Sequence, residues 1–214
     1  LHLNMSEIHL RENVVNGNVE SNRSPRIRRE VKIRCTDRLP ALLLTGKEYQ
    51  DISDEAAWVV SSYKQGYGIM ELRSPSFETY WQTSGTQPHL LTLYFRRLSL
   101  VSHLCIYLNA PVDDSYTPKK LSIRRGTQLC DLVENRIVHL EDQKGWAVIP
   151  LAVPKRNFIS AFIIQIAILE NNLNGRDSCI RQLRIFGPKD ERKSEIDELN
   201  ELLFSYYRNL CSFR

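Results

Sequence analysis

The sequence predicts an all-β fold, an antiparallel β-sandwich or jelly roll, with a closed barrel as the alternative. One observation is that short apolar runs, separated by turn-forming residues, follow one another from residue 57 to residue 186. A second is that several runs alternate between apolar and polar side chains, the pattern of a half-buried strand. A third is that no strand–helix–strand rhythm interrupts them, so a parallel sheet is not expected.

The apolar runs predict where the strands lie. In one run Leu91, Leu93 and Phe95 share a face, because successive side chains of a strand point to opposite sides. The three tryptophans begin or occupy such runs, so they are expected to pack in the core. The predicted strands cover residues 57–63, 79–83, 90–95, 99–108, 120–125, 136–140, 146–151, 159–169 and 180–186.

Both ends of the chain differ from this central domain, which is expected over residues 46–188. Residues 1–45 are predicted to form a flexible basic arm, because they hold few aromatic residues and a basic run, 23-RSPRIRREVKIR-34. A solvated arm is favoured over a nucleic-acid-binding one. Residues 189–214 are predicted to form a C-terminal helix and tail, because apolar residues recur every three or four positions over 194–211.

Cysteine usage and hydropathy indicate the compartment. The five cysteines are odd in number and no CxxC pair occurs, so a reducing compartment, nucleus and cytoplasm, is expected. No apolar run of about 18 residues suggests a membrane span. The first ten residues do not resemble a signal peptide. Neither a membrane nor a nucleic acid is therefore expected as a partner.

No set of residues predicts catalysis. Ser84 precedes His89, but the strand–turn–helix frame of a nucleophile elbow is missing, and a structural role is expected for His89. Asp113 and Asp114 could bind calcium or act as acid and base, yet their Pro-flanked turn favours local hydrogen bonding. The two glycines of 63–72 are too sparse for a phosphate loop. We therefore expect a non-enzymatic protein with no metal and no cofactor.

Six sequence blocks, in order, carry a family resemblance. Together they resemble the DOC domain of the anaphase-promoting complex subunit 10 family and span about residues 48–188. The blocks are 58-WVVSSYKQGYGIMEL-72, 78-ETYWQTSGTQPHLL-91, 104-LCIYL-108, 114-DSYTPKKLSIRRG-126, 145-GWAVIPL-151 and 165-QIAILENNLNGRDSCIRQLRIFGP-188.

The resemblance implies a galactose-binding-like β-sandwich jelly roll and a non-catalytic role in a cullin-RING ubiquitin ligase of cell division. The implied partners are the TPR and scaffold subunits of the complex, the WD40 coactivator, and substrates that carry a destruction-box degron. The implied role is that of a degron co-receptor that raises the processivity of ubiquitination. Motif matching assigns degron binding to two loops, with the candidate residues Thr83, Ser84, Gly85, Asn171, Asn172, Asn174, Gly175, Arg176 and Asp177.

Two details of the second loop are expected from its residue types. Gly175 is expected to supply a positive φ in an Asn-Gly turn. Arg176 and Asp177 are expected to tie the loop to a neighbouring strand more than to contact a ligand. The family often has His-Gln where this chain has Asn172 and Leu173, and Asp where it has Ser84, so the family's degron contacts at positions 84 and 172 are not carried over one to one.

The last two residues, Phe213 and Arg214, resemble the Ile-Arg tail with which the family docks into a TPR subunit. They keep an apolar side chain, a guanidinium and a carboxylate, the groups that such a groove can hold. The rival function is a carbohydrate-binding module on the same sandwich, a hypothesis that rests on fold analogy alone.

Overall fold

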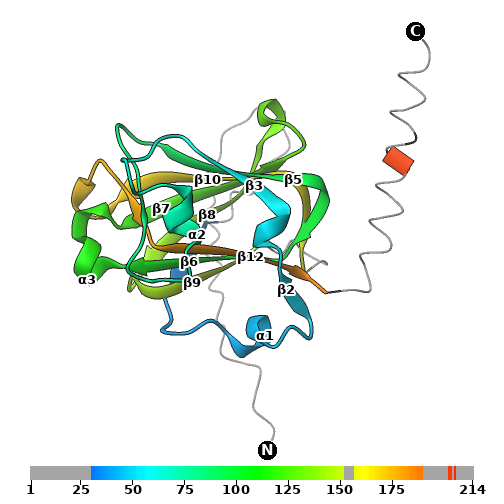
Figure 1. Ribbon diagram of the computed structural model, residues 1–214, viewed down its shortest axis with the longest axis horizontal. Coiled ribbons are helices and arrows are strands. Elements are labelled where there is room, and N and C mark those ends of the chain that lie inside the picture. Colours follow the sequence, from blue (N-terminus) through cyan, green and yellow to red (C-terminus); the bar gives the residue numbers. More distant parts are fainter. Residues whose placement is uncertain (1–29, 152–156, 190–201, 204, 206–214) are drawn as a thin grey trace, which may run out of the picture.

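The computed structural model describes residues 30–151, 157–189, 202, 203 and 205. Within these residues, two β-sheets form two layers (Figure 1). One sheet has the strand order β1-β8-β7-β10-β5-β3 and the other β2-β12-β6-β9, while β11 pairs with β4 alone. All pairs are antiparallel except β1 with β8. Two separate sheets make the fold a sandwich, as predicted, and the closed-barrel alternative is wrong.

The strands are β1 Glu30–Arg34, β2 Tyr49–Asp51, β3 Ala56–Val60, β4 Trp81–Gln82, β5 His89–Val101, β6 His103–Asn109, β7 Pro118–Gly126, β8 Val133–Glu141, β9 Lys144–Pro150, β10 Ile159–Asn171, β11 Cys179–Ile180 and β12 Gln182–Pro188. Short helices connect them: α1 Ala41–Leu44, α2 Ile69–Arg73, α3 Ala110–Asp113, and the 3-10 turns η1 Ser53–Glu55, η2 Asp114–Tyr116, η3 Leu129–Asp131 and η4 Asn172–Asn174. No described helix has the length and apolar character needed to cross a membrane.

The core lies between the two sheets and is built from alternate strand positions. Leu91 and Leu93 of β5 and Leu104 and Ile106 of β6 are all buried in one cluster. Burying such a side chain contributes about 1.5–3 kcal/mol to the stability of the fold. The strand register is therefore determined mainly by which alternate positions are apolar. All three tryptophans are buried, which confirms the predicted core role.

Two predicted strand boundaries are wrong for identifiable reasons. The exposed pair Arg96 and Arg97 interrupts the apolar pattern, so the sequence predicted two strands. Strand β5 nevertheless runs through this pair, with a register shift against β10 between Ala161 and Ile163. The predicted strand 180–186 is two strands, β11 and β12. They separate at Arg181, whose side chain is buried and paired with Asp113.

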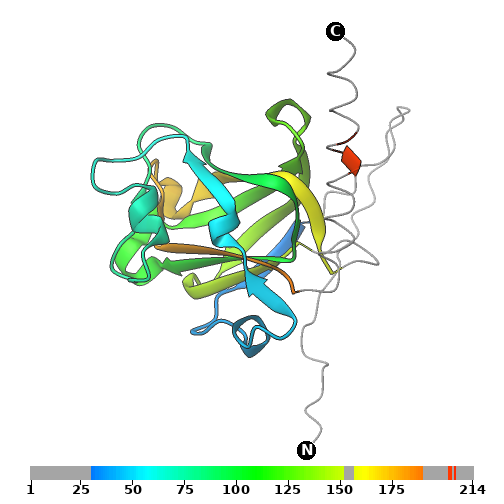
Figure 2. The same ribbon diagram turned by 45° about the vertical axis from the view of Figure 1, so that its right-hand side comes forward.

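The predicted flexible arm is wrong for residues 30–45. Val31 and Ile33 of β1 pack on the core, and β1 pairs in parallel with β8 at the edge of the larger sheet. Farther on, Leu39 and Leu43 pack beside Trp146. The short helix α1, dark blue, lies at the lower side of the molecule in Figure 2. Residues 1–29 lie outside the described residues.

The predicted C-terminal elements fall almost wholly outside the described residues. Of the predicted helix over 194–211, residues 202, 203 and 205 are described and have helical backbone. Phe213 and Arg214 lie outside. The predicted helix and docking tail therefore stay predictions.

Candidate functional site

Four connections gather at one end of the sandwich, which we call the loop end: residues 61–68, 83–87, 111–117 and 171–178. Figures 1 and 2 both show α3 and the turn after β10 at this end. The turn after β10 contains η4 and holds six of the nine candidate residues. Its position follows from β10, whose apolar run 159–169 crosses the centre of the larger sheet and delivers Asn171 to the sheet edge.

The two predicted loops do meet, and a buried hydrogen-bond pair joins them. The Thr83 backbone N–H donates to the Ser178 carbonyl oxygen at 2.9 Å, and the Ser178 N–H donates to Thr83 Oγ1 at 2.7 Å. Both side chains are fully buried. Strand β11 continues this pairing, because Cys179 lies opposite Gln82 of β4. Thr83, a predicted binding residue, therefore holds the two loops together. We call the buried residues that do this, Thr83, Asn171 and Ser178, the frame.

Asn171 also belongs to the frame. Its Nδ2 donates to the carbonyl oxygens of Gly175 at 3.0 Å and Asp177 at 2.7 Å, while its Oδ1 accepts from Ser178 Oγ at 2.9 Å. The side chain is buried, and both amide hydrogens and the oxygen are used. Asn171 thus closes the loop on itself and presents no free polar group to a ligand.

Gly175 is needed for closeness rather than for a positive φ, so that prediction is wrong. Its φ is −57°, and the positive φ values of this turn belong to Leu173 and Asn174. A Cβ added to Gly175 would lie 2.0 Å from the carbonyl oxygen of Ser115. Gln87 holds the other side, because its Nε2 donates to the Gly175 carbonyl oxygen at 3.0 Å.

Asp177 is tied by Lys64 of the 61–68 connection. The Lys64 Nζ and an Asp177 carboxylate oxygen are 2.8 Å apart, and this hydrogen bond raises the pKa of the Lys64 ammonium group. The Arg176 backbone is held from the other loop, where His89 Nε2 donates to its carbonyl oxygen at 2.6 Å. The expected tie between the loop and its surroundings is present for Asp177, whereas the Arg176 side chain is exposed.

The remaining candidates form an exposed rim above this frame. Ser84, Gly85, Asn174 and Arg176 are exposed, and the Ser84 backbone N–H donates to Ser62 Oγ at 3.1 Å. Asn172 is half-buried, and it donates to Gln143 Oε1 at 2.5 Å. Of the nine candidates, four therefore present side chains or backbone most freely to a partner. These four, which we call the rim, are Ser84, Gly85, Asn174 and Arg176.

Sequence reasoning missed the buried ion pair beneath the loop end. Arg181 Nε and Nη2 donate to the two Asp113 carboxylate oxygens at 2.9 and 2.6 Å, and its Nη1 donates to the Phe77 carbonyl oxygen at 2.6 Å. The pair raises the pKa of the guanidinium further. The available signal was one arginine inside the apolar run 180–186 and an aspartate in a Pro-flanked turn, which together indicate a buried pair.

The described residues hold no cluster of three or more His, Cys, Asp or Glu side chains that could bind a metal ion. Cys179 lies behind the joined loops, where burial and the nearby Asp113 raise its pKa to about 12. Its thiol is therefore protonated at neutral pH and is a poor nucleophile. The loop end offers amide, hydroxyl, guanidinium and backbone hydrogen bonds, which suit recognition rather than covalent chemistry.

Comparison with known proteins assigns the family. The family model described as anaphase-promoting complex subunit 10 matches residues 18–206. Proteins named anaphase-promoting complex subunit 10 from Homo sapiens and Bos taurus are each 40% identical over 162 residues, covering 75% of this chain and 88% of theirs. The protein of the same name from Schizosaccharomyces pombe is 35% identical over 153 residues, covering 71% of this chain and 81% of its own.

Solved structures show where the fold recurs. A family 32 carbohydrate-binding module of Clostridium perfringens NanJ, in complex with galactose, superposes with a TM-score of 0.54 at 15% identity, covering 64% of this chain and 98% of that one. Two such modules of Clostridium perfringens ZmpB give 0.60 at 10% identity, covering 75% of this chain and 41% of theirs. At these identities the likeness shows the galactose-binding-like jelly roll and nothing about a ligand.

Proposed function

Since the chain belongs to the anaphase-promoting complex subunit 10 family, we propose that it is a non-catalytic subunit of that ubiquitin ligase and uses its loop end as a degron co-receptor. The observation that carries the proposal is the exposed rim of Ser84, Gly85, Asn174 and Arg176 over a buried frame. The frame joins segments far apart in sequence, so the rim is held in place before a ligand arrives. This preorganisation lowers the entropy lost on binding.

The rim chemistry suits an extended peptide. The Asn174 amide carries both donors and an acceptor, and the Arg176 guanidinium can pair with a carboxylate or a carbonyl oxygen. A backbone or amide-containing side chain of a destruction box can satisfy these groups. The rim is small, so its own affinity for a degron is expected to be weak.

The WD40 coactivator would hold the same degron from another side. A peptide that is already held there meets the rim at a high effective concentration, so a weak contact slows its release. Slower release gives more ubiquitin transfers in one binding event, which is the proposed gain in processivity. The TPR and scaffold subunits would hold the chain in the complex, in the nucleus and cytoplasm.

The direct test is a triple variant, Ser84→Ala, Asn174→Gly and Arg176→Ala, in reconstituted ligase, with glycine chosen because Asn174 has a positive φ. We expect fewer ubiquitins added per encounter to a destruction-box substrate, with an unchanged melting temperature, because these side chains are exposed. The matched control is Lys47→Ala, Glu48→Ala and Lys189→Ala, exposed residues next to β2 and the end of β12. Equal processivity of both triple variants and the unmodified chain would exclude the co-receptor role.

The proposed tail contact needs its own experiment, since Phe213 and Arg214 lie outside the described residues. Deletion of both residues is expected to weaken co-purification with the TPR subunit while leaving degron-dependent processivity of the assembled complex intact. Undiminished co-purification would rule out the tail as an anchor.

A further inference from the structure

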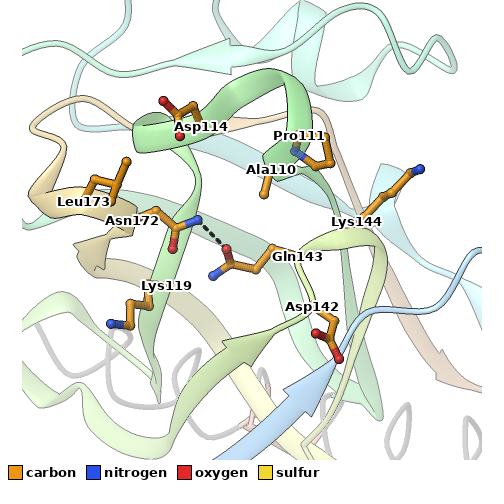
Figure 3. A pocket seen from close by; sticks show the side chains of 9 residues that line it. All are labelled: Ala110, Pro111, Asp114, Lys119, Asp142, Gln143, Lys144, Asn172 and Leu173. Atoms are coloured by element: carbon orange, nitrogen blue, oxygen red, sulfur yellow. Dashed lines mark hydrogen bonds between the residues drawn. The ribbon is translucent and has the colours of Figure 1, made fainter.

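A groove of about 670 Å³ opens beside η4, next to the rim but lined by different side chains. Figure 3 shows its walls, which come from α3 and η2, from the turn between β8 and β9, from the start of β7, and from Asn172 and Leu173. By contrast, Asn171, Gly175 and the Arg176 backbone contact the segment 83–89 or its partner Ser178. The groove therefore shares Asn172 with the nine degron-binding candidates, while none of the four rim residues Ser84, Gly85, Asn174 and Arg176 lines it.

Two amide side chains form a fixed polar floor. Gln143 Nε2 donates to the carbonyl oxygens of Pro118 at 3.0 Å and Leu140 at 3.2 Å, so the amide orientation of Gln143 is set. Its Oε1 must then accept, and it does so from Asn172 Nδ2 (Figure 3). This leaves Asn172 Oδ1 as an acceptor in the groove for the N–H of a ligand.

The backbone around the groove includes left-handed conformations, which are sterically disfavoured for residues other than glycine. Four non-glycine residues in the described ranges have positive φ, and three of them, Asp114, Asp142 and Leu173, line the groove. Their φ values are 45°, 48° and 50°. Such residues concentrate at binding sites, because the surrounding structure must hold them against their preference.

Leu173 is the least expected of the three. Its backbone is left-handed, at φ 50° and ψ 27°, where Asn or Gly is favoured over Leu. Its side chain is 79% exposed, so burial does not compensate for the conformation. A leucine that neither its backbone nor its burial favours is well placed to contact a partner through its apolar side chain.

The charges of the groove favour an acidic partner. Lys119 and Lys144 are exposed on the groove, and within the described ranges neither forms an ion pair. Asp142 is paired with Arg34, whose Nε lies 3.6 Å from a carboxylate oxygen. Among the described residues, no ion pair is formed by Asp114, so one carboxylate stands against the two ammonium groups and the unpaired charge of the groove is net positive.

We infer that this groove binds an extended acidic peptide segment of a partner protein, with an apolar residue against Leu173 and Pro111 and flanking carboxylates at Lys119 and Lys144. The peptide backbone would donate to Asn172 Oδ1. The groove is open and its charged groups are solvated, so binding is expected to be weak and dependent on ionic strength.

The probes are three short fluorescent peptides that differ only at their centre: Glu-Leu-Glu, Gln-Leu-Gln and Lys-Leu-Lys. Each is titrated into the full chain and followed by anisotropy. At low salt the Glu peptide is expected to bind about fivefold more tightly than the Gln peptide, and the Lys peptide most weakly. High salt should reduce these differences, because the contacts lie in solvent.

Two variants test whether the groove is responsible. The double variant Lys119→Glu and Lys144→Glu is expected to reverse the order of the peptides. Its matched control, Lys47→Glu with Lys189→Glu, makes the same charge change near β2, at the other side of the molecule in Figure 1, and should keep the order. Leu173→Asn is expected to raise the melting temperature and yet weaken all three peptides about threefold, because it relieves the backbone and removes the apolar contact.

The possible results separate clearly. An unchanged peptide order in the Lys119/Lys144 double variant, equal affinities for all three peptides, or an unaffected Leu173→Asn variant would each overturn the inference. Displacement of all bound peptide by inorganic phosphate alone would also overturn it, because the site would then hold a simple anion. None of these readouts involves a destruction box, so failure here leaves the co-receptor proposal to its own test.

Discussion

Asn171 and Asn174 lie three residues apart in one loop and have different roles. Asn171 is buried, and its side-chain amide forms hydrogen bonds with Gly175, Asp177 and Ser178. Asn174 is exposed and has a positive φ. The polar residues of this loop are thus of two kinds, a frame that determines its shape and a rim that is free to bind. Substitutions in the frame should cost stability first, and substitutions in the rim should cost binding alone.

The largest effect is expected below the frame, at the Arg181–Asp113 pair. Asp113→Asn leaves a buried guanidinium without its carboxylate, which should lower the free energy of unfolding by about 3–5 kcal/mol. Urea unfolding measures this loss. The control is Asp54→Asn, which removes an exposed partner of Arg73 and should cost less than about 1 kcal/mol. Equal losses in the two variants would mean that the buried pair does not hold the loop end together.

A second substitution tests the close contact between two loops. Gly175→Ala places a Cβ against the Ser115 carbonyl oxygen, and a backbone atom cannot move aside easily. We expect the variant to lose about 2–3 kcal/mol of unfolding free energy and to displace the rim, so that processivity falls as well. Gly68→Ala is the matched control, since its Cβ would meet its nearest neighbour at an ordinary 3.5 Å. A fully stable Gly175→Ala variant would contradict the frame.

Two substitutions, one at each asparagine, test the division between frame and rim. Asn171→Ala leaves Ser178 and two carbonyl groups without partners and should cost about 1–2 kcal/mol. Asn174→Gly removes the side chain but accepts the positive φ, so it should leave the melting temperature nearly unchanged and weaken degron-dependent processivity. Thermal unfolding and ubiquitination assays on both variants decide the matter. The same pattern of losses in both would show that the division between frame and rim is wrong.

The smallest effect concerns pH and lies away from the loop end. Burial lowers the pKa of His103 below its usual value of 6.5. Near pH 6 the unfolded chain therefore binds more protons at this residue, so stability falls as pH drops through 6.5 toward the lowered pKa. His103→Gln should remove this contribution and flatten the dependence of stability on pH in this range. Unfolding at pH 7.5 and 5.5 measures it, and an identical pH dependence in the two chains would refute it.

Much of the sandwich could be predicted because apolar and polar side chains alternate along its strands, and the apolar ones face the core. Leu91, Leu93 and Phe95 are buried on the face that the alternation indicates. Strand β1 was not predicted, because Val31 and Ile33 alternate with charged residues inside a basic run. Composition favoured a solvated arm there. The strand forms because β8 offers it a parallel partner that is more than a hundred residues away.

Residue patterns and motifs were enough to predict the all-β class and the family resemblance, and the resemblance implied that the two loops lie at one end. Those properties depend on local patterns and on motifs that are read along the chain. Three features required the three-dimensional arrangement: which asparagine is buried, the close approach of Gly175 to Ser115, and the exposure of Leu173 beside a groove with two exposed lysines. The physical reason is that hydrogen bonding, burial and ion pairing depend on neighbours from distant segments, and identical side chains acquire different roles from them.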